Sequence, residues 1–585
     1  MISKQDIKQF INEDQAQIKR EIESFRKLTI EEKVKERKAI VGLRYDSSYN
    51  ESNQDYALCR FIVDTNQSSL GVGDSIYVNG NEAVLWDFDN EGNIIVGFWG
   101  RAGVPSNCHS ESEEIIIEKQ YGNFLAPSYS RFLSALPNEE DSFWENGIIP
   151  SKRKVVYDGD VEKWKDHVKS FEDELGKTLL DTQREAIARA FASQDYYMLQ
   201  GPPGTGKSFV IAIIAAILAF KFGQRVCIAG PNYMAINNAL VKIGELVPQC
   251  TSGLLKVGYP YQTTGLTFTV DDESYTIQNA SGYLDVARVN EMKGIVMGMT
   301  PYTFYSSRAA GIKFDTVIID ESGQLSVPVA MMAAINCDKI IFCGDHKQLT
   351  PIIKVEDIAE PLKQSVFSYM LDEDNCTMID VSFRMNGPIC KVVSDLFYDG
   401  KLKSFSPEKR LAVNIEDAFL SGNASVVAKH ITGNGRQSSA SEAEEIDWII
   451  RSYSNAGVDG KKIGVLAPFR AQCSEIRRKL YKDAEIPDDY KKDIIVDTID
   501  KLQGQERDII ILSLTSGNID YINELSEFLY NPNKLNVALS RAKTKLIILG
   551  NFDVISQMDG YEGSYIQRLL NHPDVMVIRK DDDNS

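Results

Sequence analysis

The sequence has no run of about 18 apolar residues, the length that a helix needs to cross a bilayer. Its longest apolar stretch, residues 209–222, is shorter and follows directly on a glycine-rich loop. The first residues also lack the basic and then apolar pattern of a secretory signal. We therefore predict no membrane partner and a cytoplasmic location.

Cysteine pairs with C-x2-C spacing are also absent, although the chain contains nine cysteines. These nine are scattered between Cys59 and Cys473. Closely spaced pairs are the usual mark of zinc sites, and regular spacings in short secreted chains mark disulfide frameworks. The sequence therefore predicts neither kind of site, and most of the cysteines are expected to be small core residues.

A basic excess is missing too, since 64 Lys and Arg residues face 83 Asp and Glu residues and give a formal charge of −19. Nucleic-acid phosphates are bound by Lys and Arg, so this balance disfavours tight, non-specific binding of duplexes. It does not exclude a single strand held in a narrow channel, because a basic groove can lie within an acidic outer surface.

The chain is long enough for several domains, since 585 residues at roughly 100 to 200 per domain predict about three to five. Apolar residues at helical spacing before residue 40, and a capping box at Thr29 and Glu32, predict two N-terminal helices. Short β-rich runs between 56 and 120, separated by turn signals, predict a small β-barrel. The expected domains are a helical stalk at 1–45, a β-barrel accessory domain at 46–125, a linker or further stalk segment at 126–175, a first core at 176–355 and a second core at 356–580.

After residue 176, apolar strand-like runs alternate with helical segments, which is the pattern of a parallel sheet covered by helices. We therefore predict an α/β fold with two tandem parallel-sheet cores. The first series of expected strands comprises 196–199, 225–229, 316–319 and 339–343. The second series comprises 377–380, 462–466, 494–496, 509–513 and 546–549.

A glycine-rich loop between the first of these strands and a long apolar helix fits the phosphate-binding pattern G-x4-G-K-S. Its backbone N–H groups and the helix N-terminus would hold phosphates. Lys207 would reach the β- and γ-phosphates, and the Ser208 hydroxyl would hold Mg²⁺. The predicted ATP-binding residues of the loop are Gly201, Pro202, Pro203, Gly204, Thr205, Gly206, Lys207 and Ser208.

Two acids, Asp320 and Glu321, directly follow the expected strand at 316–319. At the mouth of a strand downstream of a phosphate loop, Asp320 would hold Mg²⁺ and Glu321 would polarise the attacking water. Gln324 and Gln348 lie in segments expected beside the same site, where a buried amide can sense the γ-phosphate. The sequence therefore predicts hydrolysis of ATP with Mg²⁺ as cofactor.

Seven motifs in one order extend this pattern into the second core. They resemble those of superfamily 1 helicases, most closely the branch of the nonsense-mediated-decay RNA helicase and the immunoglobulin-mu-binding-protein helicase. The resemblance covers about 180–550 and implies two RecA-like cores, preceded by a helical stalk and a small barrel. The motifs are LDTQ, GPPGTGKS, DESGQ, GDHKQLTP, SFRM, TIDKLQGQERD and NVALSRAK.

The resemblance implies roles for single residues. Gln183 would read the adenine edge, and Phe383 would stack on the base. Arg384 and Arg541 would act as arginine fingers within the same chain, so closure of the second core on the first would switch hydrolysis on. Gln348 would touch the γ-phosphate. The residues expected to link the ATP site to a bound strand are Asp500, Gln503, Gly504 and Glu506, of which Gly504 and Glu506 also count as nucleotide-binding residues.

Contacts to a single strand are expected at further motif positions, since motors of this kind hold the strand through its backbone with occasional base stacking. The chain departs from the family at one of them, with Pro-Asn-Tyr at 231–233 where the family has Pro-Ser-Asn. Tyr233 there suits either stacking on a base or burial. The segment at about 250–292 would match a reduced form of an inserted subdomain. The candidate strand contacts are Pro231, Asn232, Thr300, Pro301, Pro468, Phe469, Arg470 and Thr498.

We expect an ATP-dependent helicase or translocase that acts as a monomer and moves 5′ to 3′ on single-stranded RNA or DNA. An ATPase that clamps or remodels nucleic acid without unwinding fits the same motifs, because the wedge surfaces that separate strands have no motif. A ring-forming protein-remodelling ATPase can carry the same phosphate loop. It predicts instead a helical lid after a single core and arginine fingers from a neighbouring subunit.

Overall fold

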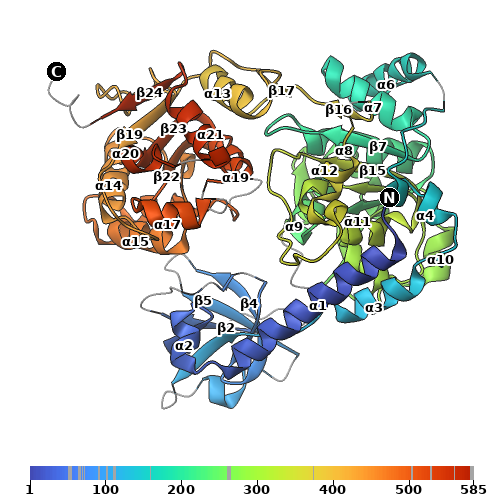
Figure 1. Cartoon of the computed structure of the whole chain (residues 1–585), viewed down its shortest axis with the longest axis horizontal. Coiled ribbons are helices and arrows are strands. Elements are labelled where there is room, and N and C mark those ends of the chain that lie inside the picture. The colour runs from blue at the N-terminus through green and yellow to red at the C-terminus, as the bar shows by residue number, and fades with distance from the viewer. Residues whose placement is uncertain are drawn as a thin grey trace.

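The computed structural model contains two sheet-based cores, a small barrel and an N-terminal helix. In Figure 1 the cores lie side by side with the barrel below them, and α1 runs from the first core to the barrel. The predicted α/β fold, with two RecA-like parallel-sheet cores, a helical stalk and a β-barrel, is confirmed. The structure describes residues 1–49, 56–63, 68, 70–71, 73–89, 93–100, 103–109, 114–158, 160–259, 265–372, 374–501, 505–526, 530–558 and 560–579.

The N-terminal segment connects the first core to the barrel. The predicted capping box at Thr29 and Glu32 is present and starts the second helix. Near the start of the first helix Phe10 is buried in the hydrophobic cluster of the first core. At its end the ring of Phe25 lies 4.4 Å from the ring of Tyr121, just after the last barrel strand. The helices are α1 (Lys4–Lys27) and α2 (Ile30–Lys35).

The barrel closes from six strands in the order β1-β2-β5-β4-β3-β6, and all neighbours are antiparallel. The sequence predicted five of these strands and missed β1, whose first residues it assigned to the preceding helix. Inward-facing residues such as Phe61 and Val96 form a hydrophobic cluster that is separate from those of the cores. The strands are β1 (Ala39–Asp46), β2 (Tyr56–Ile62), β3 (Ser75–Val78), β4 (Asn81–Phe88), β5 (Ile94–Trp99) and β6 (Ile115–Lys119).

The first core is an eight-stranded parallel sheet in the order β12-β9-β13-β8-β14-β15-β7-β16. Its strands β7 and β13 are buried along their whole length, which explains their continuous apolar sequence. The strands are β7 (Tyr196–Gln200), β8 (Arg225–Ala229), β9 (Leu254–Val257), β12 (Gln278–Ala280), β13 (Ile295–Met299), β14 (Phe314–Ile319), β15 (Cys337–Gly344) and β16 (Cys376–Met378). Helices include α7 (Asp181–Ala192), α8 (Lys207–Ala216), α9 (Tyr233–Leu246) and α11 (Val327–Ala334).

The edges of the first sheet differ from the prediction. Strand β16, predicted as the opening strand of the second core, pairs in parallel with β7 and lies at the edge of the first sheet. At the opposite edge lie β9 and β12, which come from the predicted insertion and were not recognised as strands. An apolar pattern identifies a strand but not its sheet, because pairing depends on contacts between segments far apart in the sequence.

The second core is a six-stranded parallel sheet in the order β21-β20-β22-β23-β19-β24. Four of its strands coincide with predicted runs, whereas β19 and β24 were not predicted. The strands are β19 (Val426–His430), β20 (Ile463–Ala467), β21 (Ile495–Thr498), β22 (Arg507–Ser513), β23 (Ala542–Gly550) and β24 (Val575–Ile578). Helices include α13 (Gly387–Phe397), α14 (Ala440–Asn455), α15 (Arg470–Lys482), α19 (Pro532–Leu539) and α21 (Gly560–Leu570).

None of the helices in the described part of the chain is both long enough and apolar enough to span a membrane. The apolar run at 209–222 contains α8, which is 10 residues long and packs in the hydrophobic cluster of the first core. Its apolar sequence is therefore explained by burial on all sides.

Glu442, on the first turn of α14, is a buried carboxylic acid held by neutral donors. The Ser513 hydroxyl donates to its Oε2 at 2.6 Å and the Thr515 N–H donates to the same atom at 3.0 Å. Burial raises the pKa of Glu442 to about 7, and these hydrogen bonds offset only part of the rise. Because the folded state then binds a proton that the unfolded state releases, this group lowers stability as pH rises from about 4.5 to about 7.

Glu442→Gln is therefore expected to change the pH dependence of stability. The free energy of unfolding of the variant, relative to that of the wild type, should increase by on the order of 1 to 3 kcal/mol as pH rises from 5 to 8, because the amide does not ionise. Thermal unfolding midpoints at the two pH values measure this difference. Glu444→Gln, at an exposed position of the same helix, is the control. Equal shifts for Glu442→Gln at both pH values would contradict the assignment.

Candidate active site

The glycine-rich loop connects β7 to α8 at the carboxyl edge of the first sheet. Gly204 and Gly206 adopt φ angles of +73° and +81°, which other residues reach only with strain. A Cβ atom on Gly201 would lie 2.6 Å from Cβ of Lys207, and one on Gly204 would lie 2.5 Å from Cβ of Arg384. The loop therefore needs glycine at these positions, because side chains from both neighbouring segments pack directly on its backbone.

Lys207 lies between the two predicted acids, with its Nζ 2.8 Å from Asp320 Oδ1 and 2.6 Å from Glu321 Oε1. Burial alone would lower the pKa of Lys207, but the two carboxylates outweigh burial and raise it above its ordinary value. Burial raises the pKa of Asp320. Burial acts on Glu321 in the same sense, but Lys207 outweighs it and lowers the pKa of that carboxyl. The structure thus brings together the lysine and both acids that the sequence singled out.

The backbone after β14 fixes the two acids in place. Glu321 adopts a left-handed φ of 53°, which is uncommon for a residue other than glycine. The Gln324 side-chain amide donates to Glu321 Oε2 at 3.0 Å, so the predicted glutamine lies at the site. A Cβ atom on Gly323 would lie 2.8 Å from the Asp345 carbonyl oxygen. The DESGQ segment therefore packs closely against the loop that contains Gln348.

Gln183 and Phe383 flank the glycine-rich loop. The buried Gln183 side chain donates to the Thr205 carbonyl at 3.1 Å and accepts from the Leu180 N–H at 3.1 Å. The Phe383 N–H donates to the Gly204 carbonyl at 2.8 Å, and its ring is 46% exposed. The ring of Phe405, which sequence reasoning missed, lies 4.8 Å from that of Phe383. These positions suit the predicted recognition of a flat base beside the loop.

Both predicted arginines lie where the two cores meet. Arg384 Nε donates to Glu506 Oε2 at 2.5 Å, and its Nη1 donates to the Ser540 carbonyl at 3.0 Å. Glu506 also pairs with Lys543 at 2.9 Å. Arg541 is buried and donates from Nη1 to the Gln505 carbonyl at 3.3 Å, while its Nε has no hydrogen-bond partner. The buried guanidinium of Arg541 therefore retains an unused donor.

The charges of Arg541 and of Glu321, on opposite cores, each affect the pKa of the other. Burial and the neighbouring Arg384 lower the pKa of Arg541 to about 9, whereas Glu321 acts in the opposite direction. Arg541 in turn helps to lower the pKa of Glu321, which belongs to the other core. Arg541 stays charged at neutral pH, and its charge acts across the boundary between the cores.

Gln348 lies beside the glycine-rich loop, as predicted. Its side-chain amide donates to Asp345 Oδ2 at 2.9 Å and reaches the Gly201 carbonyl at 3.5 Å. The Ser382 hydroxyl, which was not predicted, donates to the Pro203 carbonyl at 2.9 Å. The loop is thus held by the first core on one side and by the segment that leads into the second core on the other.

These groups fit a nucleoside triphosphate with Mg²⁺. The glycines leave room for phosphates at the start of α8, and Lys207 supplies a positive charge there. The Ser208 hydroxyl and the Asp320 carboxylate are oxygen donors of the kind that Mg²⁺ prefers. The residues that the structure describes contain no cluster of three or more His, Cys, Asp or Glu that could hold a metal. A magnesium ion shared between these two side chains and phosphate oxygens is compatible with that donor set.

Comparison with known proteins follows the division into two cores. A protein-family model described as "AAA domain" matches residues 178–365, and another with the same description matches residues 362–553. The Neurospora crassa protein named "Regulator of nonsense transcripts 1 homolog" is 26% identical over 412 residues, which cover 64% of this chain and 37% of that protein. All seven motifs lie between residues 178 and 553, and so do the strands of both sheets except β24. These comparisons and the order of the motifs support a superfamily 1 helicase.

The chain is also similar to proteins whose names refer to DNA. "DNA polymerase alpha-associated DNA helicase A" of Schizosaccharomyces pombe is 24% identical over 553 residues, covering 84% of this chain and 80% of that protein. "DNA replication ATP-dependent helicase/nuclease DNA2" of Xenopus laevis is 27% identical over 466 residues, covering 72% of this chain and 42% of that protein. The chain spans between 28% and 42% of the length of the helicase/nuclease relatives from Xenopus laevis, Mus musculus and Schizosaccharomyces pombe.

Four of the helicase's predicted strand contacts follow strands of the first sheet. Pro231 and Asn232 come just after β8, and the Asn232 side chain accepts from the Ala235 N–H at 2.9 Å and so caps α9. Thr300 comes directly after β13, where its hydroxyl lies 3.0 Å from that of Thr303, and Pro301 is buried. These side chains therefore have local structural roles at the edge of the first sheet, where a nucleic-acid strand is expected.

The remaining contacts lie at the corresponding edge of the second sheet. Pro468, Phe469 and Arg470 follow β20, and Phe469 is buried. Thr498, the last residue of β21, is buried as well. Of the residues expected to link the two sites, Asp500 is exposed and pairs with Lys534 at 3.6 Å. Gln503 and Gly504 lie outside the residues that the structure describes.

The barrel contacts this edge of the second core. Arg470 donates to the Leu70 carbonyl of the barrel at 3.4 Å, and a Cβ atom on Gly71 would lie 3.2 Å from Lys501 Nζ. Burial lowers the pKa of Lys501, Asp497 and Asp74 act in the opposite direction, and Arg470 and Arg477 add to the lowering. Lys501 and Arg477 were not predicted, because neither residue lies in a motif position that the resemblance assigns to a strand. They gather positive charge beside the barrel.

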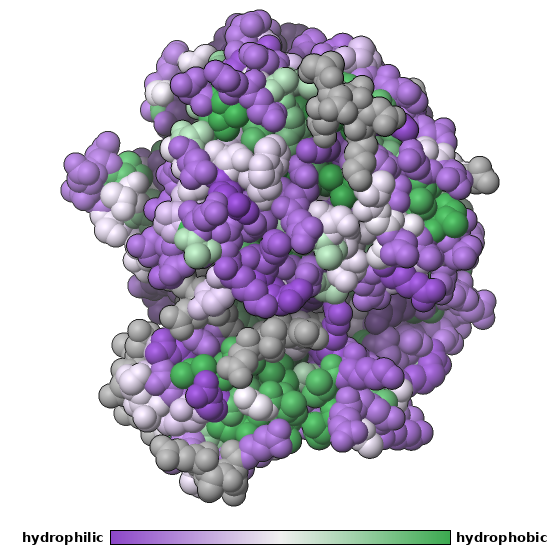
Figure 2. All heavy atoms as spheres, turned by 90° about the vertical axis from the view of Figure 1, so that its left-hand side faces the viewer, coloured by the Kyte–Doolittle hydropathy of each residue, from purple (hydrophilic) through white to green (hydrophobic). Residues whose placement is uncertain are grey.

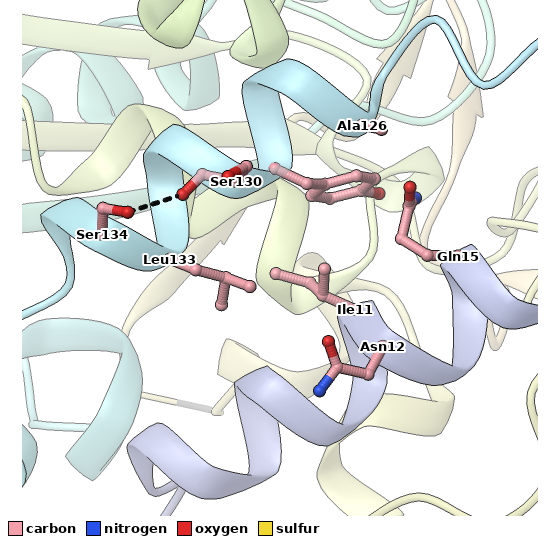
Figure 3. Close-up of a pocket in the computed structure, with 8 residues that line it drawn as sticks. Ile11, Asn12, Gln15, Ala126, Ser130, Leu133 and Ser134 are labelled. Carbon is pink, nitrogen blue, oxygen red and sulfur yellow. Dashed lines mark hydrogen bonds between the residues drawn. The ribbon is translucent and has the colours of Figure 1, made fainter.

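The stalk is tied to the segment after Pro301. The Tyr129 hydroxyl of α3 (Ala126–Ala135) lies 3.4 Å from the Tyr302 hydroxyl, with the two rings edge to face. Between α1 and α3 lies a groove of about 400 Å³, and Figure 3 shows Ile11 and Leu133 facing each other across it. None of the residues that line this groove belongs to the phosphate loop.

The outer face of the barrel has exposed aromatic surface. Figure 2, which shows the left-hand side of Figure 1, has an apolar patch at the barrel end of the molecule. On the barrel, the buried Tyr56 has its ring 5.1 Å from those of both Trp86 and Trp99. Gly97 makes room for them, since a Cβ atom there would lie 3.0 Å from the Trp86 ring. Trp99 is 65% exposed, so the helicase fold itself leaves its ring largely uncovered.

Proposed function

We propose that this chain hydrolyses ATP and couples hydrolysis to movement along, or separation of, nucleic-acid strands. The observation that carries the proposal is the position of Arg541 of the second core, which acts electrostatically on Glu321 of the first. An arginine that neutralises charge in phosphoryl transfer is then supplied within the same chain. The rate of hydrolysis would depend on how closely the two cores approach each other.

Each residue of the site has a chemical task in this proposal. When nucleotide binds, the Lys207 ammonium group would leave the two acids and contact the β- and γ-phosphates. Glu321 would then be free to orient a water molecule and accept its proton. Ser208 and Asp320 would hold Mg²⁺, which supplies positive charge to the phosphate oxygens. Arg541 would stabilise the charge that develops in the transition state, and Arg384 would keep Glu506 and the Ser540 carbonyl in place beside it.

A single strand would run along the carboxyl edges of both sheets, on the side of the cores that the barrel contacts. The positive residues Arg470, Arg477 and Lys501 beside the barrel support this path, because phosphates are bound by such side chains. By its family resemblance the chain would move 5′ to 3′ and act as a monomer in the cytoplasm. The relatives' names include both DNA helicases and a regulator of nonsense transcripts, so the strand could be DNA or RNA.

Two other functions share parts of this site. The ring-forming ATPase is disfavoured, because the chain has a complete second parallel sheet where a helical lid is expected and contains its own buried arginine at the phosphate site. An ATPase that clamps or remodels nucleic acid without unwinding uses the same site and the same strand path. Only strand displacement distinguishes it from a helicase.

ATP turnover is expected to rise about 5- to 150-fold, the usual range of coupling between two sites, when single-stranded RNA or DNA is added. Turnover is measured with single-stranded RNA, single-stranded DNA and duplex in parallel, followed by strand displacement on 5′-tailed and 3′-tailed duplexes. Displacement confined to 5′-tailed duplexes supports 5′ to 3′ movement. Stimulated turnover without displacement supports the clamp, and no stimulation by any nucleic acid would contradict the whole proposal.

A further inference from the structure

A buried chain of hydrogen bonds crosses from the first core to the second beside Gln348. Its centre is Asp345, just after β15, whose Oδ1 accepts from the Gln200 side-chain amide at 3.1 Å. Asp345 Oδ2 accepts from Gln348 Nε2 at 2.9 Å and from the Tyr398 hydroxyl at 2.6 Å. Tyr398 comes directly after α13 of the second core. One carboxylate oxygen is therefore shared between a glutamine of the ATP site and a tyrosine of the other core.

A second contact closes this chain into a ring. Asn536 on α19 donates from Nδ2 to the Tyr398 hydroxyl at 2.8 Å and to the Lys347 carbonyl at 2.6 Å. Asn533 on the same helix donates to the His346 carbonyl at 3.1 Å. The second core thus bonds two backbone carbonyls of the loop 345–348 and the carboxylate of Asp345. Asp345, Tyr398 and Asn536 are all at most 3% exposed, so water does not compete for these bonds.

The ring is close to Arg541 along the chain. Asn536 and Arg541 are five residues apart, on α19 and the turn that follows it, and five residues of helix rise only about 7.5 Å. Burial and the neighbouring Asp345 raise the pKa of Tyr398 well above its ordinary value, so its hydroxyl keeps the proton that it donates. Because Asn536 bonds both the loop 345–348 and Tyr398, the helix that directly precedes Arg541 is tied to that loop.

We propose that Tyr398 is a positioning residue that couples the orientation of Gln348 to the placement of the second core. A γ-phosphate that accepts from the Gln348 amide would reorient that amide and change its bond to Asp345 Oδ2, the oxygen to which Tyr398 also donates. A change in the position of Tyr398 then moves its partner Asn536 and, through α19, the following Arg541. This inference rests on the proposed function, since it names the residue through which nucleotide state and strand binding are coupled.

Tyr398→Phe tests the inference, because it removes one hydroxyl and keeps the ring that fills the core. The affinity for a fluorescent single-stranded oligonucleotide is measured with and without a non-hydrolysable ATP analogue, and the ratio of the two dissociation constants gives the coupling. We expect the coupling of the variant to fall about tenfold, as for the loss of one hydrogen bond to a charged acceptor. Oligonucleotide-stimulated kcat should fall by a similar factor, while KM for ATP changes less than about threefold.

Tyr453→Phe is the matched control, since Tyr453 is buried in the second core and donates to the Leu420 carbonyl at 3.0 Å away from the boundary. Both variants lose one buried hydroxyl, so a merely structural effect lowers their unfolding midpoints alike and leaves the coupling intact. Coupling in Tyr398→Phe that equals that of Tyr453→Phe would overturn the inference alone. A wild-type protein that no oligonucleotide stimulates would overturn the proposed function and this inference together.

Discussion

Arg541→Ala is expected to lower ATP turnover by about 10³- to 10⁵-fold, the range found for arginine fingers. Arg541 is buried at the boundary between the cores, and its Nε has no hydrogen-bond partner. Its charge acts on Glu321 of the first core and so lies near the reacting phosphate in the proposed site. Because the arginine acts on charge that develops during the reaction, its removal should change kcat far more than the affinity for nucleotide.

Turnover is measured with saturating single-stranded oligonucleotide, and nucleotide affinity with a fluorescent ATP analogue. Arg541→Lys should recover little activity, because an ammonium group lacks the planar, several-pronged donor set of guanidinium. Arg568→Ala is the control, since Arg568 lies on the exposed side of α21. Turnover of Arg541→Ala within about tenfold of the wild type would exclude a finger role.

Lys207→Ala is expected to lower turnover by about 10²- to 10³-fold, the cost of removing one preorganised donor to developing charge. It should also destabilise the protein, because Asp320 and Glu321 are then buried without their cation. Losing one partner of a buried ion pair costs on the order of 3 kcal/mol. Without Lys207 the folded-state pKa of both acids rises, so the variant binds protons on folding and loses stability as pH rises above about 4.5.

Unfolding midpoints of Lys207→Ala at pH 5 and pH 8 check the second effect, and the deficit should be larger at pH 8. Lys242→Ala, which removes a surface lysine paired with Glu245, controls for the loss of a positive charge. Turnover in Lys207→Ala close to that of this control would refute the site. A stability deficit that is the same at both pH values would refute the placement of Lys207 between two acids.

Local sequence was sufficient to predict the chemical groups of the nucleotide site. The loop at 201–208 has its own glycine pattern, and Asp320 and Glu321 directly follow a buried strand, so short segments determine their geometry. Lys207, both acids and Gln324 lie together as expected. Parallel strands present their carboxyl ends at one edge, and this general rule brings together motifs more than 100 residues apart.

Contacts between segments were beyond the reach of such reasoning. Strand β16 joins the first sheet and not the second, although its sequence is compatible with either. Leu70 and Gly71, which contact Arg470 and Lys501 of the second core, lie in no motif themselves. The role of Tyr398 was likewise not predictable, because nothing in the sequence after a helix indicates a hydrogen bond to Asp345, 53 residues earlier.

The sequence by itself determined that this protein has a phosphate loop, two acids at a strand end, and arginines in a second core. It did so because local backbone geometry and apolar periodicity are properties of short segments. Only the tertiary structure decided which strands share a sheet, how Arg541 is buried near Glu321, and that Asp345, Tyr398 and Asn536 meet. Those features arise from packing and from the burial of polar groups, which pair with whatever partner the whole fold brings within reach.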